Sequence, residues 1–91
     1  MKHAGPSALD RLEPLLRSLR KNGALKEKTP GNFYRKGRAF LHFHEHGDEF
    51  FADVRLGEDF ERLPATTLAD RKSLLAQIAR VANDGKKTSA R

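Results

Sequence analysis

The run from Arg38 to Leu56 constrains the fold of this chain more than any other part, because two apolar-rich segments flank a single turn signal. It holds four of the six phenylalanines and three of the four histidines in the sequence. The turn signal is His46-Gly47-Asp48, and a glycine followed by an aspartate is typical of the two-residue turn of a β-hairpin. The sequence therefore predicts an antiparallel hairpin over residues 38–56.

A two-residue turn at Gly47-Asp48 sets the register of this hairpin. Successive side chains of a strand alternate between faces, so the register sorts the residues into two sets. One set is almost wholly apolar and is the expected core face: Ala39, Leu41, Phe43, Glu45, Phe50, Ala52, Val54 and Leu56. The other set, here called the histidine face, consists of Phe40, His42, His44, His46, Glu49, Phe51, Asp53 and Arg55.

The histidine face admits three interpretations. It is an ordinary sheet face, with His42 hydrogen-bonded to Asp53. It is a metal site, in which His42 and His44, about 7 Å apart along the strand, bind an ion together with Asp53. Zinc uses imidazole and carboxylate ligands of this kind, but His46 lies too far along the strand to reach the same ion. It is a recognition surface for a ligand or a protein, formed by Phe40, His42, His44, Phe51, Asp53 and Arg55.

Enzyme chemistry has less support in the sequence than binding. His42 and Asp53 could act as an acid–base pair across the two strands. The sequence has no G-x-x-x-x-G-K-[ST] or G-x-G-x-x-G motif, and none of its serines stands in a nucleophile elbow. We therefore expect a binding module without a cofactor, and a metal-dependent or acid–base enzyme centred on His42, His44 and Asp53 is the alternative.

The segment before the hairpin predicts a helix and one or two strands. Leucines recur at helical spacing within residues 8–21, with Ser7 as the expected N-cap and Gly23 as the stop. Pro14 is expected either to kink this helix or to lie in its first regular turn. Residues 1–6 are expected to be loose. Residues 24–29 predict an edge strand, and a further strand begins at Phe33.

The segment after the hairpin predicts a short fourth strand at residues 60–63 and a second helix. Thr67 and Asp70 form a capping signature, and Leu68, Leu75, Ile78 and Ala82 mark the apolar side of that helix. The expected fold is α+β: a two-layer sandwich with an N-terminal helix, a three- to four-stranded antiparallel meander and a C-terminal helix. Residues 1–85 would form this single domain, and residues 86–91 a disordered basic tail.

Charge is distributed unevenly along the chain, whose formal net charge is +6. Residues 11–38 hold nine Lys or Arg against two acidic residues, whereas residues 45–61 hold seven acidic residues against one Arg. Tyr34, Arg35, Lys36 and Arg38 mix cations with a ring on which a base could stack, so nucleic-acid binding is a further alternative. The opposite charge of the two segments argues against a uniform basic surface and favours a protein partner or a homodimer.

Composition also sets the expected location. The sequence has no cysteine, which excludes disulfides and thiolate metal sites within it. No apolar run approaches the ~20 residues that a membrane span needs, and the first residues lack the apolar core of a signal peptide. We expect a cytoplasmic protein that does not enter the membrane.

The run F-L-H-F-H-E-H-G followed by F-A-D-V-R-L resembles a group of small bacterial proteins labelled luciferase-family. Their pattern of a hydrophobic residue, H-x-H-G and then Ala-Asp would match His42, His44, Ala52 and Asp53. This chain departs from the pattern because Glu45-His46 precedes Gly47, and because Arg55-Leu56 stands where Phe-Pro is usual. The label carries no luciferase activity to this chain. The resemblance implies that His42, His44 and Asp53 are the residues of functional interest.

Overall fold

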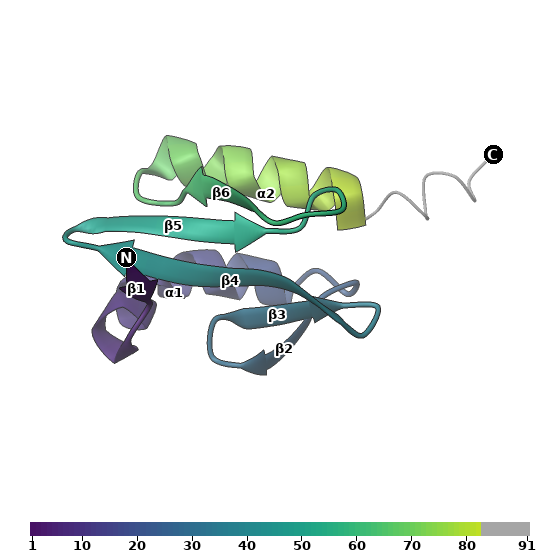
Figure 1. The fold of residues 1–91 in the computed structure, drawn as a ribbon, viewed down its shortest axis with the longest axis horizontal. Helices are drawn as coiled ribbons and strands as arrows, with labels where there is room; N and C mark the ends of the chain where they lie inside the picture. Colours follow the sequence, from purple (N-terminus) through teal and green to yellow (C-terminus); the bar gives the residue numbers. More distant parts are fainter. Residues whose placement is uncertain (83–91) are drawn as a thin grey trace.

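The computed structural model describes residues 1–82, which form six strands and two helices (Figure 1). The elements in chain order are β1 (Lys2–His3), α1 (Pro6–Arg20), β2 (Lys26–Thr29), β3 (Asn32–Arg35), β4 (Arg38–His46), β5 (Glu49–Val54), β6 (Glu61–Pro64) and α2 (Leu68–Ala82). The antiparallel sheet has the order β2-β3-β4-β5-β6, and β1 also pairs with β4. The expected end of the second helix near residue 84 and the expected basic tail lie outside the described residues.

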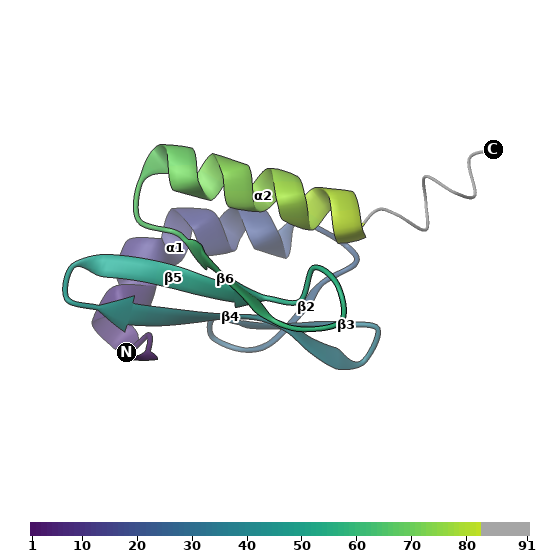
Figure 2. The same ribbon diagram turned by 45° about the horizontal axis from the view of Figure 1, so that its top comes forward.

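Both helices lie on the same side of the sheet, and no helix of residues 1–82 lies on the opposite face (Figure 2). The predicted α+β class, with one helix at each end of an antiparallel sheet, is confirmed. The sheet is wider than the three or four strands expected, because residues 26–29 also pair, as β2, with β3 and because β1 adds to β4. None of the helices within residues 1–82 has the length and apolar character needed to cross a membrane.

The predicted hairpin register is confirmed. β4 and β5 pair His42 with Asp53, His44 with Phe51 and His46 with Glu49. Five residues of the expected core face are 4% exposed or less: Leu41, Phe43, Phe50, Ala52 and Val54. Each large apolar side chain that is fully buried stabilises the fold by about 1.5–3 kcal/mol, so the core face holds the register in place.

Phe40 departs from its predicted position on the histidine face. It is 2% exposed and belongs to the hydrophobic core. The pairing of β3 with β4 shifts by one residue between Phe33–Leu41 and Tyr34–Ala39, which leaves Phe40 as an extra residue in β4. A bulge of this kind breaks the strict alternation of side chains, so neighbouring residues can both turn toward the core. Phe40 is therefore a core residue and not part of an open binding surface.

Helix α1 begins earlier than the sequence predicted. Pro6 occupies its first turn and Gly5 is the N-cap, so Ser7 lies inside the helix and the predicted Ser7 cap is wrong. The carboxylate of Glu45 accepts a hydrogen bond of 2.8 Å from the Gly5 backbone N–H. A carboxylate at a helix N-terminus is stabilised by the helix dipole. This contact attaches α1 to the far end of β4, and the helix continues through Pro14.

Helix α2 has the predicted capping box and, apart from Leu68, its large apolar residues lie on the predicted side. Thr67 Oγ1 accepts the Asp70 N–H at 3.0 Å, and the Asp70 carboxylate accepts the Thr67 N–H at 3.0 Å. Leu68, expected on the apolar side, is 80% exposed, whereas Leu74 and Ile78 are each 1% exposed. Leu68 is the first residue of the helix, beyond the part that the sheet covers.

Strand β1 is absent from the sequence prediction, which treated residues 1–6 as loose. Lys2 pairs with Glu45 and His3 pairs with His44, and the Ala4 N–H donates to the Phe43 carbonyl at 3.1 Å. This two-residue strand is too short to show alternation in the sequence. Its position on β4 brings His3 to the histidine face.

Replacing Phe40 tests its core position. We expect Phe40→Ala to lower the free energy of unfolding by about 3–5 kcal/mol, because a buried aromatic ring leaves a cavity. Phe51→Ala, which removes a half-buried ring from the open face, should cost about 1–2 kcal/mol. Urea denaturation of both variants provides the comparison, and equal costs would contradict the assignment.

Candidate metal site on the open face of the sheet

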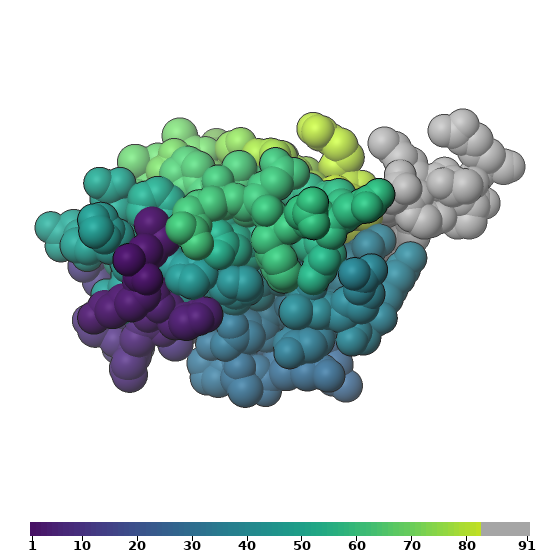
Figure 3. Space-filling view, in the orientation of Figure 1, coloured from purple at the N-terminus to yellow at the C-terminus, as the bar shows by residue number. Residues whose placement is uncertain are grey.

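Four neighbouring strands contribute side chains to one place on the helix-free face. β4 supplies His42 and His44, and the facing residue of β5 is Asp53. Arg62 of β6 pairs with Asp53, and His3 of β1 pairs with His44. In the space-filling view the N-terminal residues, in dark purple, lie on this face beside the teal hairpin (Figure 3). The site therefore lies where four strands pair side by side.

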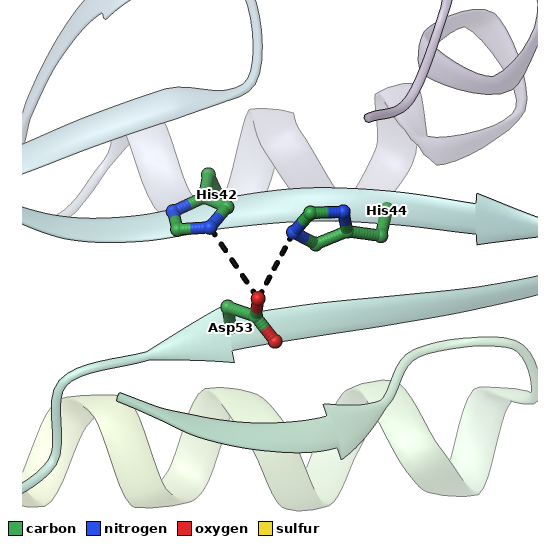
Figure 4. A group of neighbouring side chains, drawn as sticks. All are labelled: His42, His44 and Asp53. Atoms are coloured by element: carbon green, nitrogen blue, oxygen red, sulfur yellow. Dashed lines mark ion pairs between the residues drawn. The ribbon is translucent and has the colours of Figure 1, made fainter. Parts of the chain in front are cut away.

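One carboxylate oxygen is the centre of this cluster. Asp53 Oδ2 lies 2.9 Å from Nε2 of His44 and 3.4 Å from Nε2 of His42, and both rings point toward it (Figure 4). The alternation of β4 puts the two histidines on one face, and the hairpin register puts Asp53 opposite them. The three residues that the sequence selected as a metal set are thus brought together, with ligand atoms within 4.8 Å of one another.

His44 has an unusual environment for a histidine. It is 9% exposed, and neither of its ring nitrogens has a hydrogen-bond partner among the described residues. Its Nε2 is close to Asp53, but the contact lacks the alignment of a hydrogen bond. A buried polar group without a partner costs free energy, and such groups in native structures call for an explanation. Ligation of an ion would supply one.

Arg62 holds the Asp53 carboxylate in place. Its Nε donates to Oδ1 at 2.8 Å and its Nη2 donates to Oδ2 at 2.9 Å. The Asp53 side chain is only 13% exposed. This two-point contact is the main reason why the pKa of Asp53 is lowered, and burial opposes it. Asp53 is therefore an ionised and oriented carboxylate at neutral pH.

Burial keeps His42 neutral. The pKa of His42 is lowered chiefly by desolvation, and the nearby His44 and His3 add to that effect while Asp53 opposes it. The ring of Phe60 packs edge-on against the His42 ring at 5.2 Å between centroids. A neutral imidazole retains the lone pair that a metal ligand needs.

His3 is the member of the cluster that sequence reasoning missed. Its ring centroid lies 4.6 Å from that of His44 and 5.7 Å from that of His42. The rings of His42 and His44 are 5.0 Å apart. His3 thus lies beside the two imidazoles that contact the Asp53 carboxylate. No pattern within the first six residues indicates that His3 joins a strand, so the sequence offers no signal for this contact.

Two of the ligand-atom separations are close to those around a zinc-type ion. Zinc–ligand bonds of about 2.0–2.1 Å in a tetrahedron place neighbouring ligand atoms about 3.3 Å apart. The distances from Asp53 Oδ2 to the two histidine nitrogens, 2.9 and 3.4 Å, bracket this value. Rotation of the imidazole rings would bring the nitrogens onto one ion.

No protein-family model, curated protein or solved structure matches this chain. The resemblance to the proteins labelled luciferase-family therefore stays a prediction. What the site can do must be argued from its own geometry.

The other residues proposed from the sequence have different positions. Phe51 is half-buried on the histidine face and pairs with His44. The guanidinium of Arg55 lies over the Phe60 ring at 4.4 Å and donates to the carbonyls of Ala39 and Glu58. Arg55 thus anchors the loop after β5. His46 is exposed at the end of the hairpin.

Replacing Arg62 tests the electrostatics of the cluster in the absence of metal. In Arg62→Gln we expect the pKa of Asp53 to rise, because the guanidinium is the main cause of its lowering. A carboxyl group whose pKa is lowered in the folded state stabilises the fold at pH values above its ordinary pKa. This stabilisation is lost as the pH falls through the folded-state pKa. The variant should therefore show less loss of stability below pH ~4, measured by carboxyl-carbon NMR and by acid unfolding. An unchanged Asp53 pKa would contradict the pairing.

Proposed function

We propose that the protein is a small binding domain that holds a divalent metal ion of the zinc type on the histidine face, through His42, His44 and Asp53. The observation that carries this proposal is the convergence of two imidazole nitrogens on one carboxylate oxygen, at 2.9 and 3.4 Å, with both nitrogens of His44 otherwise unpartnered. An ion among these atoms would give a nitrogen of His44 the partner that it lacks.

The protonation states support the proposal. Metal ligation requires a neutral imidazole and an ionised carboxylate. The pKa of His42 is lowered by burial and the pKa of Asp53 is lowered by Arg62, so both residues have the required form at neutral pH. A set of nitrogen and oxygen ligands without sulfur suits zinc and other transition ions of similar size.

Arg62 orients the carboxylate, in the way that outer ligand partners do in zinc sites. Its positive charge also opposes a cation at the same place. Because Arg62 is itself 47% exposed, water screens much of that repulsion. The orientation of Asp53 is therefore retained at a modest electrostatic cost.

Zinc titration of the protein tests the proposal. We expect one Zn²⁺ to bind per chain by calorimetry, with the affinity lowered at least about tenfold in His42→Ala and in Asp53→Asn, since even outer partners of metal ligands change affinity by about 10–100-fold. The matched control is His46→Ala, which removes a histidine from the same strand outside the cluster. The chain should be untagged, so that all histidines are its own.

Equal affinity in all three variants and the parent, or no zinc binding by a folded protein, would contradict the proposal. The broader interpretation, recognition of another ligand or a partner by the same face, would then be preferred. That interpretation is supported by the helix-free face and by the partly exposed rings of Phe51 and Phe60. A homodimer through this face stays a prediction.

A second candidate function is binding of phosphate groups, as in a nucleic acid, at the β3–β4 turn. Arg35, Lys36, Arg38 and Arg55 line a hollow of about 150 Å³, and no acidic side chain of residues 1–82 lines it. The turn itself is tight, with Lys36 at φ 54° and Gly37 at φ 78°. Tyr34, expected to stack a base, does not line this hollow, and Lys28 lies 4.4 Å over its ring.

Salt dependence tests this second candidate. We expect a fluorescent single-stranded oligonucleotide to bind with an affinity that falls steeply as salt is added, because phosphate contacts release counterions. Arg38→Ala should weaken binding and reduce the salt slope by about one unit. Lys72→Ala, which removes an exposed cation from α2, is the control, and equal effects of the two variants would indicate non-specific attraction only.

A further inference from the structure

We propose that His3 is the fourth ligand of the metal site, so that the bound ion is enclosed by protein ligands and fastens strand β1 to the sheet. This inference rests on the proposed function. It extends the site from the hairpin to a residue 39 positions away from His42 in the sequence, and it decides which class of metal site this is.

The pairing of β1 places His3 for this role. His3 is directly opposite His44 in the antiparallel pair, so the two side chains lie on the same face of the sheet. Its ring centroid is within 5.7 Å of both histidine rings of β4. Among the residues that the structure describes, no other imidazole approaches these two rings within the same range.

His3 must turn to become a ligand. Its ring stacks on the His44 ring with 31° between their planes, so the two rings present faces instead of nitrogens to each other. His3 is exposed, which leaves room for rotation about its side-chain bonds. The strand that carries it has only two residues, and a slight shift of so short a strand disturbs few backbone hydrogen bonds.

Neighbouring residues are poor alternatives for the fourth position. Glu45 precedes His46 in β4 but accepts the Gly5 N–H on the helix side of the strand. His46 pairs with Glu49 at the turn, one further step along the strand from His44. Asp53 is already a ligand through Oδ2, and its Oδ1 accepts from Arg62. His3 is the residue with both the right chemistry and the right place.

The number of protein ligands determines what the metal can do. Catalytic zinc sites have three protein ligands and keep one position for water, whereas structural zinc sites have four. With His3, the set of three imidazoles and one carboxylate leaves no position for a reacting water. The site would then stabilise the fold or respond to metal concentration, and a hydrolytic role for His42, His44 and Asp53 would be excluded.

A closed site also links metal binding to the order of the N-terminal strand. β1 is held by its two-residue pairing with β4 and by the Ala4 N–H to Phe43 carbonyl bond. A metal bond from His3 would hold β1 at the residue next to that hydrogen bond. Because the site exists only in the folded state, the binding energy stabilises that state. The Ala4 amide therefore reports on the proposed closure.

The test uses Co²⁺ in place of Zn²⁺ in untagged protein, because the visible absorption of Co²⁺ is intense in a four-coordinate tetrahedral site and weak at higher coordination. We expect the parent protein and His46→Ala to give the intense spectrum. His3→Ala should give a weaker spectrum with added water ligands and an affinity for Zn²⁺ at least about tenfold lower. Hydrogen exchange of the Ala4 amide should slow when metal is added to the parent, but not when it is added to His3→Ala.

The outcomes separate this inference from the proposal on which it rests. If His42→Ala loses zinc binding while His3→Ala keeps the affinity and spectrum of the parent, the site is a three-ligand site and the role of His3 is overturned. If His42→Ala also retains the affinity of the parent, both proposals fall. His3 is exposed, so His3→Ala should fold normally, and circular dichroism before titration checks this.

Discussion

The register of the β4–β5 hairpin is the constraint on which the rest of the structure depends. Six consecutive residue pairs, from Leu41–Val54 to His46–Glu49, fix it. Because a strand has a period of two, the same register that turns Phe43 and Ala52 toward the helices turns His44 and Asp53 away from them. A slip of one residue would move the imidazoles and the carboxylate into the core, where burial without partners is costly. The apolar core thus selects the arrangement of the polar cluster.

Near its C-terminal end, β4 contacts the N-terminal segment of the chain on both of its faces. Glu45 on the helix side accepts the N–H of Gly5, the residue from which α1 starts, while His44 and His3 pair directly across β1 and β4. The segment between β1 and α1 is therefore held from both sides of one strand. A change at His3 and a change at Glu45 would act on the same short connection, although the two side chains lie on opposite faces.

Much of this arrangement could be predicted from sequence, because it follows from alternation. The turn at Gly47, the core face and the trio of His42, His44 and Asp53 follow from a period of two and one loop length. Phe40 could not be placed, because the bulge opposite β3 depends on pairing between strands and leaves no local signal. The cap of α1 was misplaced for a related reason, since its partner is Glu45, a residue of another strand.

The sequence did not indicate that His3 and Arg62 belong to the site, and the reason differs from that for Phe40. His3 belongs to a two-residue strand. Arg62 belongs to a four-residue strand, and its partner follows only once the position of that strand in the sheet is known. The His3 contact joins strands that are distant in the chain, whereas Arg62 lies only nine residues after Asp53, on the next strand. Local periodicity reports which face a residue occupies, but the neighbour across a ladder is set by topology.

The ordinary explanation of a histidine beside an aspartate is a satisfied hydrogen bond, and here it is incomplete. Asp53 is oriented by two aligned bonds from Arg62, and that orientation leaves the His44 nitrogen near Oδ2 but out of line with it. The same arrangement points an oxygen lone pair and two imidazoles at a common position. The proposed ion would give the imperfect His44–Asp53 contact a third participant.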